Sequence, residues 1–117
     1  MHELVIVVDD HAGIRELLVR TLAAHGFTAS AFASAEAAQA GANWAEASLA
    51  LIDWMMPGMP GTDLITWVAE HHPDVHLVVV TAAREALLLS MPEIVDHAVI
   101  LDKTDLTPER LRQIIAA

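Results

Sequence analysis

Short apolar runs alternate with longer segments of helical period along the whole chain. The runs lie at residues 4–8, 29–32, 49–52, 77–80 and 98–101, and each is too short to form a helix. Most of them lack the polar alternation of a half-exposed sheet, which favours parallel strands that are covered on both faces. We therefore expect five buried, parallel strands.

Helical patterns fill the intervals between these runs. Ile14, Leu18 and Leu22 follow the i, i+4 spacing of an amphipathic helix that ends before Gly26. Ser34 is expected to cap a short alanine-rich helix that carries an acidic residue in its first turn. Further helices are expected after Gly61 and from the cap pair Thr107 and Pro108.

The alternation amounts to five successive β-α units, which predicts a doubly wound α/β fold with a five-stranded parallel sheet and right-handed crossovers. The 117 residues contain 55% hydrophobic side chains, enough for one core and too little for two. No linker or repeat interrupts the pattern. We expect a single domain over residues 1–117.

The fourth helical segment, residues 85–95, departs from the pattern. Three adjacent leucines, Leu87 to Leu89, cannot all lie on one buried stripe, and Pro92 is expected to break the helix near Ser90. Either some of these leucines are exposed as a contact surface, or a distorted helix buries them. The sequence leaves both open.

Charge and composition exclude several functions. The net charge is −10 and only six residues are Lys or Arg, which argues against direct nucleic-acid binding. The chain has no cysteine, so it has no disulfide framework. The N-terminus does not resemble a signal peptide, and no apolar run approaches a membrane span. We expect a cytoplasmic protein without membrane contact.

Polar residues follow four of the five expected strands, where ligands collect in doubly wound folds. Three strand ends carry carboxylates, and two carry a hydroxyl or an ammonium group: Asp9, Asp10, Asp53, Thr81, Asp102 and Lys103. Carboxylates crowded at one edge repel each other unless a cation lies among them, and Mg²⁺ prefers such oxygens. Taken singly, each residue also fits an ordinary polar loop.

Four motifs in order are more specific than any one of them. VVDD, IDWMMPGMPG, VVVTA and LDKT end the first, third, fourth and fifth strands. Together they resemble the receiver domain of two-component response regulators, over essentially the whole chain. The resemblance implies the (βα)5 flavodoxin-like fold. It also implies a non-enzymatic signalling module whose partners are a sensor histidine kinase or phosphotransfer protein and a downstream protein or output domain.

The resemblance also assigns roles. Asp53 would be the phosphoacceptor, and Thr81 and Lys103 would each bind a phosphoryl oxygen. Asp9, Asp10 and Asp53, with the backbone carbonyl of Met55, would hold Mg²⁺. The fourth helix, fifth strand and fifth helix would form the signalling surface, which can include a homodimer contact. The physical logic agrees, because phosphoryl transfer needs a positioned nucleophile and neutralised oxygens.

Several positions depart from that family. Ile100 stands where receivers usually have a switching aromatic residue, and an isoleucine lacks a hydroxyl and has a stiff χ1. Thr104 replaces the usual proline after Lys103, so we expect no cis peptide there. Met55 and Ala83 offer no polar group to position a hydrolytic water, which predicts slow self-dephosphorylation.

Three classes of function remain open from the sequence. The first is a phosphorylatable receiver that shifts between two conformations. The second is a receiver-like interaction or dimerisation module that does not depend on phosphorylation. The third is a phosphohydrolase with an aspartyl-phosphate intermediate. Haloacid dehalogenase-like enzymes need a second acid two residues after the nucleophile, and Met55 occupies that position.

The histidines and tryptophans give weaker indications of function than the four motifs do. The seven histidines have no metal-ligand spacing, and the neighbours His71 and His72 would point about 100° apart on a helix. His11, directly after the acidic pair, is expected to be a solvated loop residue at the rim. Trp44 and Trp67 are expected to pack in the core, while Trp54 adjoins the acceptor.

Overall fold

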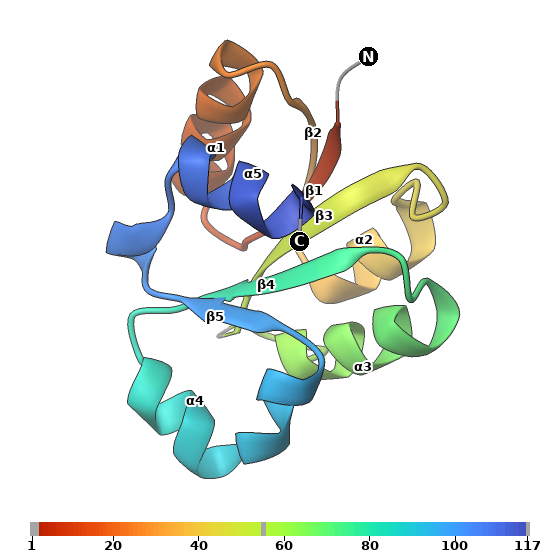
Figure 1. Ribbon diagram of the computed structural model, residues 1–117. Helices are drawn as coiled ribbons and strands as arrows, with labels where there is room; N and C mark the ends of the chain where they lie inside the picture. Colours follow the sequence, from red (N-terminus) through yellow and green to blue (C-terminus); the bar gives the residue numbers. More distant parts are fainter. Residues whose placement is uncertain (1–2, 55, 117) are drawn as a thin grey trace.

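The computed structural model describes residues 3–54 and 56–116, with Lys103 described by its backbone alone. Five parallel strands form one sheet in the order β2-β1-β3-β4-β5. Their bounds are β1 Leu4–Val8, β2 Thr28–Phe32, β3 Ala47–Asp53, β4 His76–Val80 and β5 Val99–Leu101. All five expected strands are present, and the predicted doubly wound α/β architecture is confirmed (Figure 1).

Within residues 3–54 and 56–116, five α-helices and two short 3₁₀ helices lie between the strands or follow the last one. The α-helices are α1 Ala12–Ala24, α2 Ala35–Gly41, α3 Gly61–His71, α4 Arg84–Ser90 and α5 Pro108–Ala116. The 3₁₀ helices are η1 Pro92–Asp96 and η2 Lys103–Asp105. The helices cover the two faces of the sheet, as right-handed crossovers require (Figure 1).

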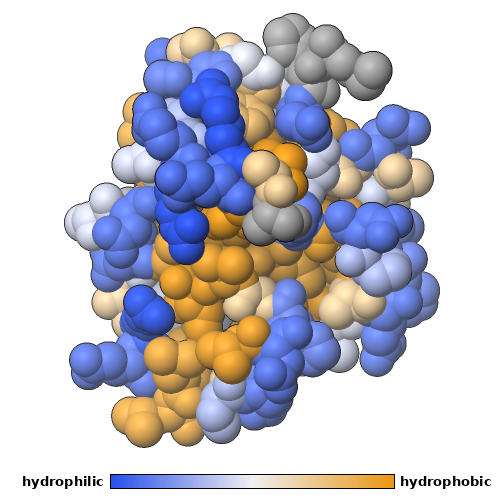
Figure 2. Space-filling view, in the orientation of Figure 1, coloured by the Kyte–Doolittle hydropathy of each residue, from blue (hydrophilic) through white to orange (hydrophobic). Residues whose placement is uncertain are grey.

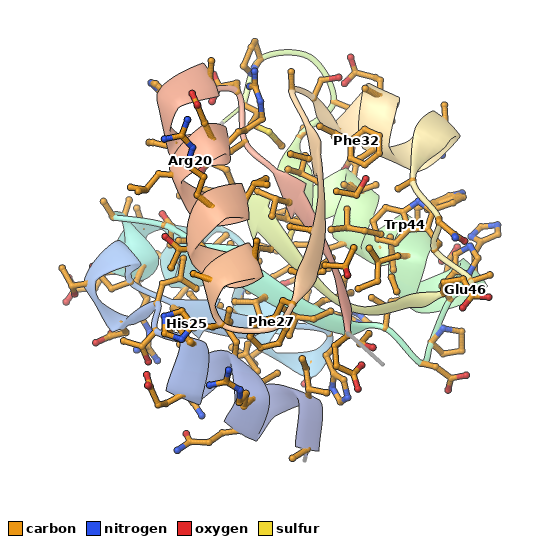
Figure 3. All side chains as sticks on the ribbon, turned by 90° about the horizontal axis from the view of Figure 1, so that it is seen from above. Arg20, His25, Phe27, Phe32, Trp44 and Glu46 are labelled. Atoms are coloured by element: carbon orange, nitrogen blue, oxygen red, sulfur yellow. The ribbon has the colours of Figure 1, made fainter. Side chains whose placement is uncertain are left out.

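The core has two halves, one on each face of the sheet. Val5 and Val7 pack with side chains of α1 and α5, whereas Ile6 and Val8 pack with side chains of α2, α3 and α4. Figure 3 shows Phe27 and Trp44 on opposite sides of the strands. Alternate residues of one strand therefore serve different cores, which explains the continuous apolar run.

Local capping follows the sequence. The Ser34 hydroxyl accepts a hydrogen bond from the Ala37 amide at 3.1 Å, and the Thr107 hydroxyl accepts one from the Arg110 amide at 3.2 Å. Gly26, just after α1, has a φ of +88°, a conformation that favours glycine. The described residues contain no cis peptide bond, in agreement with the expectation for Thr104.

The edge strands differ from the simple expectation of full burial. Strand β2 contains exposed and half-buried residues but no buried one, because it has a neighbour on one side only. Strand β5 has three residues and begins at Val99, one residue later than expected. The buried strands of the sequence pattern are therefore chiefly β1, β3 and β4.

The segment with three leucines is broken where Pro92 predicts it. Helix α4 ends at Ser90 and the 3₁₀ helix η1 begins at Pro92. Leu87 is fully buried, Leu88 is half-buried and Leu89 is 85% exposed, so the two alternatives for this segment each hold for part of it. Within residues 3–54 and 56–116, no helix has the length and apolar character that a bilayer crossing requires.

Candidate phosphoacceptor and metal site

Strand register brings the predicted site residues to one edge of the sheet. Val8 pairs with Ile52, so Asp9 lies beside Asp53. Asp53 itself pairs with Val80, so Thr81 follows directly on the other side. Val80 pairs with Leu101, which places Asp102 next in the row. The residues that end these strands thus lie together, because the carboxyl ends of parallel strands share one edge of the sheet.

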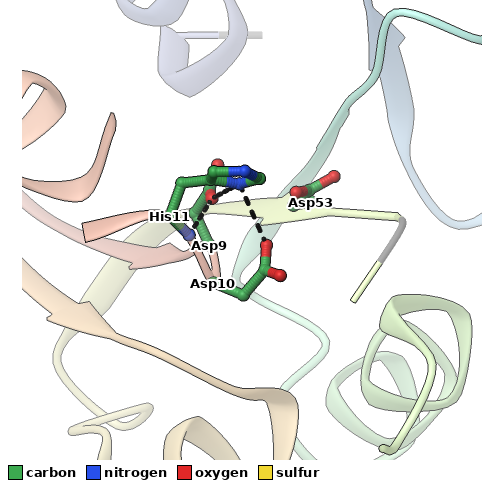
Figure 4. Close-up of side chains that lie close together, drawn as sticks. All are labelled: Asp9, Asp10, His11 and Asp53. Atoms are coloured by element: carbon green, nitrogen blue, oxygen red, sulfur yellow. Dashed lines mark hydrogen bonds and ion pairs between the residues drawn. The ribbon is translucent and has the colours of Figure 1, made fainter. Parts of the chain in front are cut away.

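Three aspartates and a histidine form one cluster at this edge (Figure 4). One ligand atom from each of Asp9, Asp10, His11 and Asp53 lies within 4.8 Å of the others. Asp9 and Asp53 are 5% and 8% exposed. The side chain of Asp10 is 29% exposed. Such closely spaced carboxylates are stable together only with compensating positive charge or hydrogen bonds.

The oxygen donors of this cluster fit a hard divalent cation. The Oδ1 atom of Asp10 is shielded from solvent and accepts no hydrogen bond from the described residues. Asp9 Oδ1 accepts one from the backbone amide of His11 at 2.8 Å, which leaves further lone pairs on that carboxylate. Carboxylate oxygens with spare lone pairs are the ligands that Mg²⁺ prefers.

Thr81 ends the fourth strand with its hydroxyl held in place. The residue is 3% exposed, and its Oγ1 accepts a hydrogen bond from the Ala83 amide at 2.9 Å. Its backbone amide donates to the Leu101 carbonyl at 3.0 Å. A hydroxyl that accepts one hydrogen bond still has its proton to donate, so Thr81 is able to donate to a ligand oxygen.

The end of the fifth strand is ordered by Asp102. Its carboxylate accepts hydrogen bonds from the Thr104 amide at 3.1 Å and the Thr104 hydroxyl at 3.0 Å. These bonds, the backbone one first, hold the pKa of Asp102 below its ordinary value. Lys103 begins η2 directly after this residue. Its side chain, the predicted phosphoryl ligand, lies outside the description.

The loop after β3 is shaped by two glycines. A Cβ on Gly61 would lie 2.5 Å from the Asp53 carbonyl oxygen, so only glycine lets α3 begin so close to the acceptor strand. Gly58 has a φ of +81°. Met55, whose carbonyl is the predicted metal ligand, lies outside the described residues.

Glu36 holds this loop from α2, a contact that the sequence did not suggest. Its Oε1 accepts a hydrogen bond from the Met59 amide at 2.7 Å. The two residues are 23 positions apart, so only the folded chain brings them together. The sequence around the Ser34 cap indicated an acidic residue in the first turn of α2, but it did not indicate which residue this carboxylate would contact.

His11 is closer to the cluster than expected. Its side chain is 68% exposed, as a solvated loop residue would be, but Nδ1 lies 3.3 Å from Asp10 Oδ1 and 3.6 Å from Asp9 Oδ1 (Figure 4). Its position directly after two aspartates was the available signal. The spacing rules for paired histidines did not detect it, because its neighbours in the cluster are carboxylates.

The other aromatic residues have packing roles. Trp44 is buried, and its Nε1 donates to the Ala38 carbonyl at 3.0 Å. Trp67 meets Trp44 edge to face at 6.1 Å and stacks on His71. Trp54, next to the acceptor, is half-buried against the core formed with α3. The expectations for Trp44 and Trp67 are thus confirmed.

Fold and site together define an α/β protein with a cluster of acidic side chains at the carboxyl edge of its sheet. The family model of the response regulator receiver domain matches residues 5–115. The chain belongs to this family, and the match favours a receiver over the phosphohydrolase alternative.

Curated relatives include DctD, the C4-dicarboxylate transport transcriptional regulatory protein of Rhizobium meliloti, which is 38% identical over 77 residues. That alignment covers 66% of this chain and 17% of DctD. NtrC, a DNA-binding transcriptional regulator of Escherichia coli K12, is 39% identical over 80 residues, with 68% and 17% coverage. The chain therefore matches about a sixth of the length of these relatives.

Solved structures show the same fold. A response regulator receiver protein from Pseudomonas putida is 26% identical, with a TM-score of 0.77 and coverage of 99% of this chain and 97% of that one. The response regulator TrrA from Thermotoga maritima, solved in complex with Mg²⁺-BeF, has a TM-score of 0.80 at 23% identity. That alignment covers 96% of this chain and 98% of TrrA.

Proposed function

We propose that this chain is a phosphoacceptor receiver and that Asp53 takes the phosphoryl group. The observation that carries the proposal is the convergence of Asp53, Asp9 and Thr81 at one edge of the sheet, in a chain of the receiver family. Asp53 ends the central strand, so its carboxylate is presented by the most firmly held part of the sheet.

The proposed reaction transfers a phosphoryl group from a phosphohistidine to Asp53. A carboxylate oxygen of Asp53 attacks the phosphorus of the phosphohistidine on a sensor kinase or phosphotransfer protein. An O–P bond forms as the N–P bond breaks, and the released imidazole nitrogen takes a proton from solvent. The product is an aspartyl phosphate, a mixed anhydride. The chain is itself the phosphorylated product, so it does not act as an enzyme on a separate substrate.

The residues around Asp53 bind and orient the phosphoryl group. The Thr81 hydroxyl donates to one phosphoryl oxygen, and the Lys103 ammonium pairs with another. Asp9, Asp10 and Asp53, with the Met55 carbonyl, would hold Mg²⁺. When bound, this ion neutralises charge on the transferring oxygens.

The signalling surface of the proposal is formed by α4, β5 and α5. A groove of about 720 Å³ runs between these elements, bordered by Val95, Ile100 and Arg110 among others. Figure 2 shows hydrophobic residues gathered on this face, between α5 and α4. Val95, which borders the groove, is 58% exposed, and Leu89 of α4 is 85% exposed. A downstream protein, an output domain or a second copy of the chain would bind here.

The proposal also covers the extent of the domain, its location in the cell and its partners. The chain functions as one receiver domain over residues 1–117 in the cytoplasm, with no direct contact to nucleic acid. The exposed Leu89 and Val95 also favour a second candidate, an interaction or dimerisation module that works without phosphate. The two candidates differ in whether Asp53 reacts.

Intact-mass spectrometry after incubation with acetyl phosphate and Mg²⁺ tests this difference. We expect the wild-type chain to gain one phosphoryl group and Asp53→Asn to gain none. Asp63→Asn is a matched control, because Asp63 is an exposed carboxylate in the first turn of α3. A wild-type chain that binds Mg²⁺ but is never labelled would favour the phosphate-independent module.

The lifetime of the labelled form is a further test. Ala83 carries no polar side chain to position an attacking water beside Thr81, and Met55 has none either. We expect the aspartyl phosphate to survive for many minutes after the phosphodonor is removed. A lifetime of a few seconds would show that another group activates water.

A further inference from the structure

We propose that His11 binds a metal ion together with the carboxylates of Asp9, Asp10 and Asp53, and that its imidazole shifts the preference of this site from Mg²⁺ towards Mn²⁺. This inference rests on the proposed function, since it concerns the same metal site. It assigns a side chain that neither the family motif nor the spacing of the histidines points to.

Geometry is the first support. In an octahedral site with metal–oxygen distances of about 2.1 Å, adjacent ligand atoms lie about 3.0 Å apart and opposite ones about 4.2 Å apart. The Nδ1 atom of His11 is 3.3 Å from Asp10 Oδ1 and 3.6 Å from Asp9 Oδ1. These separations are close to those of adjacent ligands, and every ligand atom of the four-residue cluster lies within 4.8 Å of the others.

The local backbone places His11 beside the acidic pair. The amide of His11 donates to Asp9 Oδ1 at 2.8 Å, which closes a tight turn over the acidic pair. Arg15 donates to the Asp9 carbonyl at 2.7 Å from the first turns of α1. Asp9 thus accepts two hydrogen bonds that hold the turn at residues 9–11, and the imidazole stands beside both carboxylates (Figure 4).

Hydrogen bonding alone does not account for this arrangement. Asp10 Oδ1 is shielded from solvent and accepts no hydrogen bond from residues 3–54 and 56–116, although His11 Nδ1 is 3.3 Å away. A shared cation would satisfy both atoms, because a neutral imidazole nitrogen and a carboxylate oxygen are each metal ligands.

The chemistry of the donor set then predicts selectivity. Mg²⁺ takes oxygen ligands almost exclusively. Mn²⁺ also prefers oxygen ligands, but as a first-row transition ion it accepts an imidazole nitrogen more readily than Mg²⁺ does. Replacing a water ligand by His11 would therefore strengthen Mn²⁺ binding more than Mg²⁺ binding. We expect His11→Ala to weaken Mn²⁺ affinity about tenfold, as loss of a single group from a metal site does, and to change Mg²⁺ affinity much less.

The test uses Mn²⁺ alone as the probe. Electron spin echo envelope modulation of the bound ion detects a directly coordinated nitrogen, and we expect that signal in the wild-type chain and its loss in His11→Ala. His25→Ala is the control, because His25 is an exposed histidine at the other end of α1. Mn²⁺ and Mg²⁺ titrations of the same three proteins give the affinity ratio.

The outcomes separate the inference from the proposed function. Absence of nitrogen coupling, together with acetyl phosphate labelling of the wild-type chain, overturns the role of His11 and leaves the phosphoacceptor standing. Coupling that persists in His11→Ala also overturns it. A wild-type chain that neither binds metal nor becomes labelled overturns both. Coupling that His11→Ala removes, with a fall in the Mn²⁺ to Mg²⁺ affinity ratio, supports the assignment.

Discussion

Glu36 links α2 to the loop that follows the acceptor strand. Its carboxylate accepts the Met59 amide at 2.7 Å, and a Cβ on the neighbouring Gly58 would lie 2.9 Å from its other oxygen. Glycine is therefore favoured at position 58 by its positive φ, and a Cβ there would also displace the Glu36 carboxylate. One side chain thus restrains the loop beyond Asp53 from a distant part of the sequence.

Replacing Glu36 tests this restraint. We expect Glu36→Ala to lower the free energy of unfolding by about 1 kcal/mol, because it removes an exposed hydrogen bond to a charged group. The amide proton of Met59 should shift upfield in the NMR spectrum. Urea denaturation and chemical shifts measure the two effects. Glu70→Ala, on the exposed face of α3, should produce neither; an equal loss there would contradict the role of Glu36.

The hydrogen bonds at Asp102 predict a pH effect with a definite sign. Because the folded chain lowers the pKa of this carboxyl, the stability that it contributes is present above its unfolded value near 3.8. That contribution is lost as the pH falls through the lower, folded pKa. Acid therefore weakens the start of η2.

Thr104→Val isolates part of this effect. The variant removes the hydroxyl donor and keeps the backbone amide, which is the larger cause of the shift. We expect the pKa of Asp102 to rise part of the way towards 3.8. A carbon-detected NMR titration of the Asp102 carboxyl measures it. Thr66→Val, whose hydroxyl bonds to the Thr62 carbonyl within α3, should leave the pKa of Asp102 unchanged.

At the scale of elements, α4 is anchored by one residue and exposes another. Leu87 is fully buried with Ile94 and Ile100 in the core half that faces α4, whereas Leu89 is 85% exposed. Ile100 is itself only 7% exposed, so the residue at the usual switching position already lies inward. If the proposed function includes a change of state at this face, we therefore expect it to involve repacking of α4 more than the swing of a large side chain.

Two substitutions in α4 separate anchoring from contact. We expect Leu87→Ala to lower the free energy of unfolding by about 2–5 kcal/mol, because it leaves a cavity in the core. Leu89→Ala should change it by less than about 0.5 kcal/mol, as exposed positions usually do. Chemical denaturation compares the two. An effect of Leu89→Ala that grows with protein concentration would show that Leu89 is buried against a second copy.

The start of α3 depends on a glycine. Gly61→Ala would place a Cβ 2.5 Å from the Asp53 carbonyl oxygen, and the helix would have to move away from the acceptor strand. We expect a loss of about 1–3 kcal/mol in the free energy of unfolding, as in other overpacked sites. Gly13→Ala in α1, where nothing lies within 4 Å of the added Cβ, should stabilise the chain slightly.

At the scale of the whole molecule, the sequence predicted the fold and the edge of the sheet at which most of the candidate site residues lie together. Strand ends were readable because buried parallel strands are continuous apolar runs, and register then brings Asp9, Asp53 and Thr81 together without further information. The contacts of His11 and Glu36 could not be predicted in the same way. They depend on how a turn and a helix lie against the sheet, and no periodicity encodes that.

The position of β3 in the sheet has a kinetic consequence. This strand has neighbours on both sides, whereas β5 is a three-residue strand that pairs only with β4 among the described residues. Amide protons of Ala50 to Ile52 should exchange with deuterium only when the whole domain unfolds, while those of β5 and α4 should exchange through smaller openings. We therefore expect Asp53, the proposed phosphoacceptor, to lie in the last segment that opens. We expect α4 and β5, which belong to the proposed signalling surface, to be among the first. The signalling surface would then open many times while the carboxylate of Asp53 stays in place.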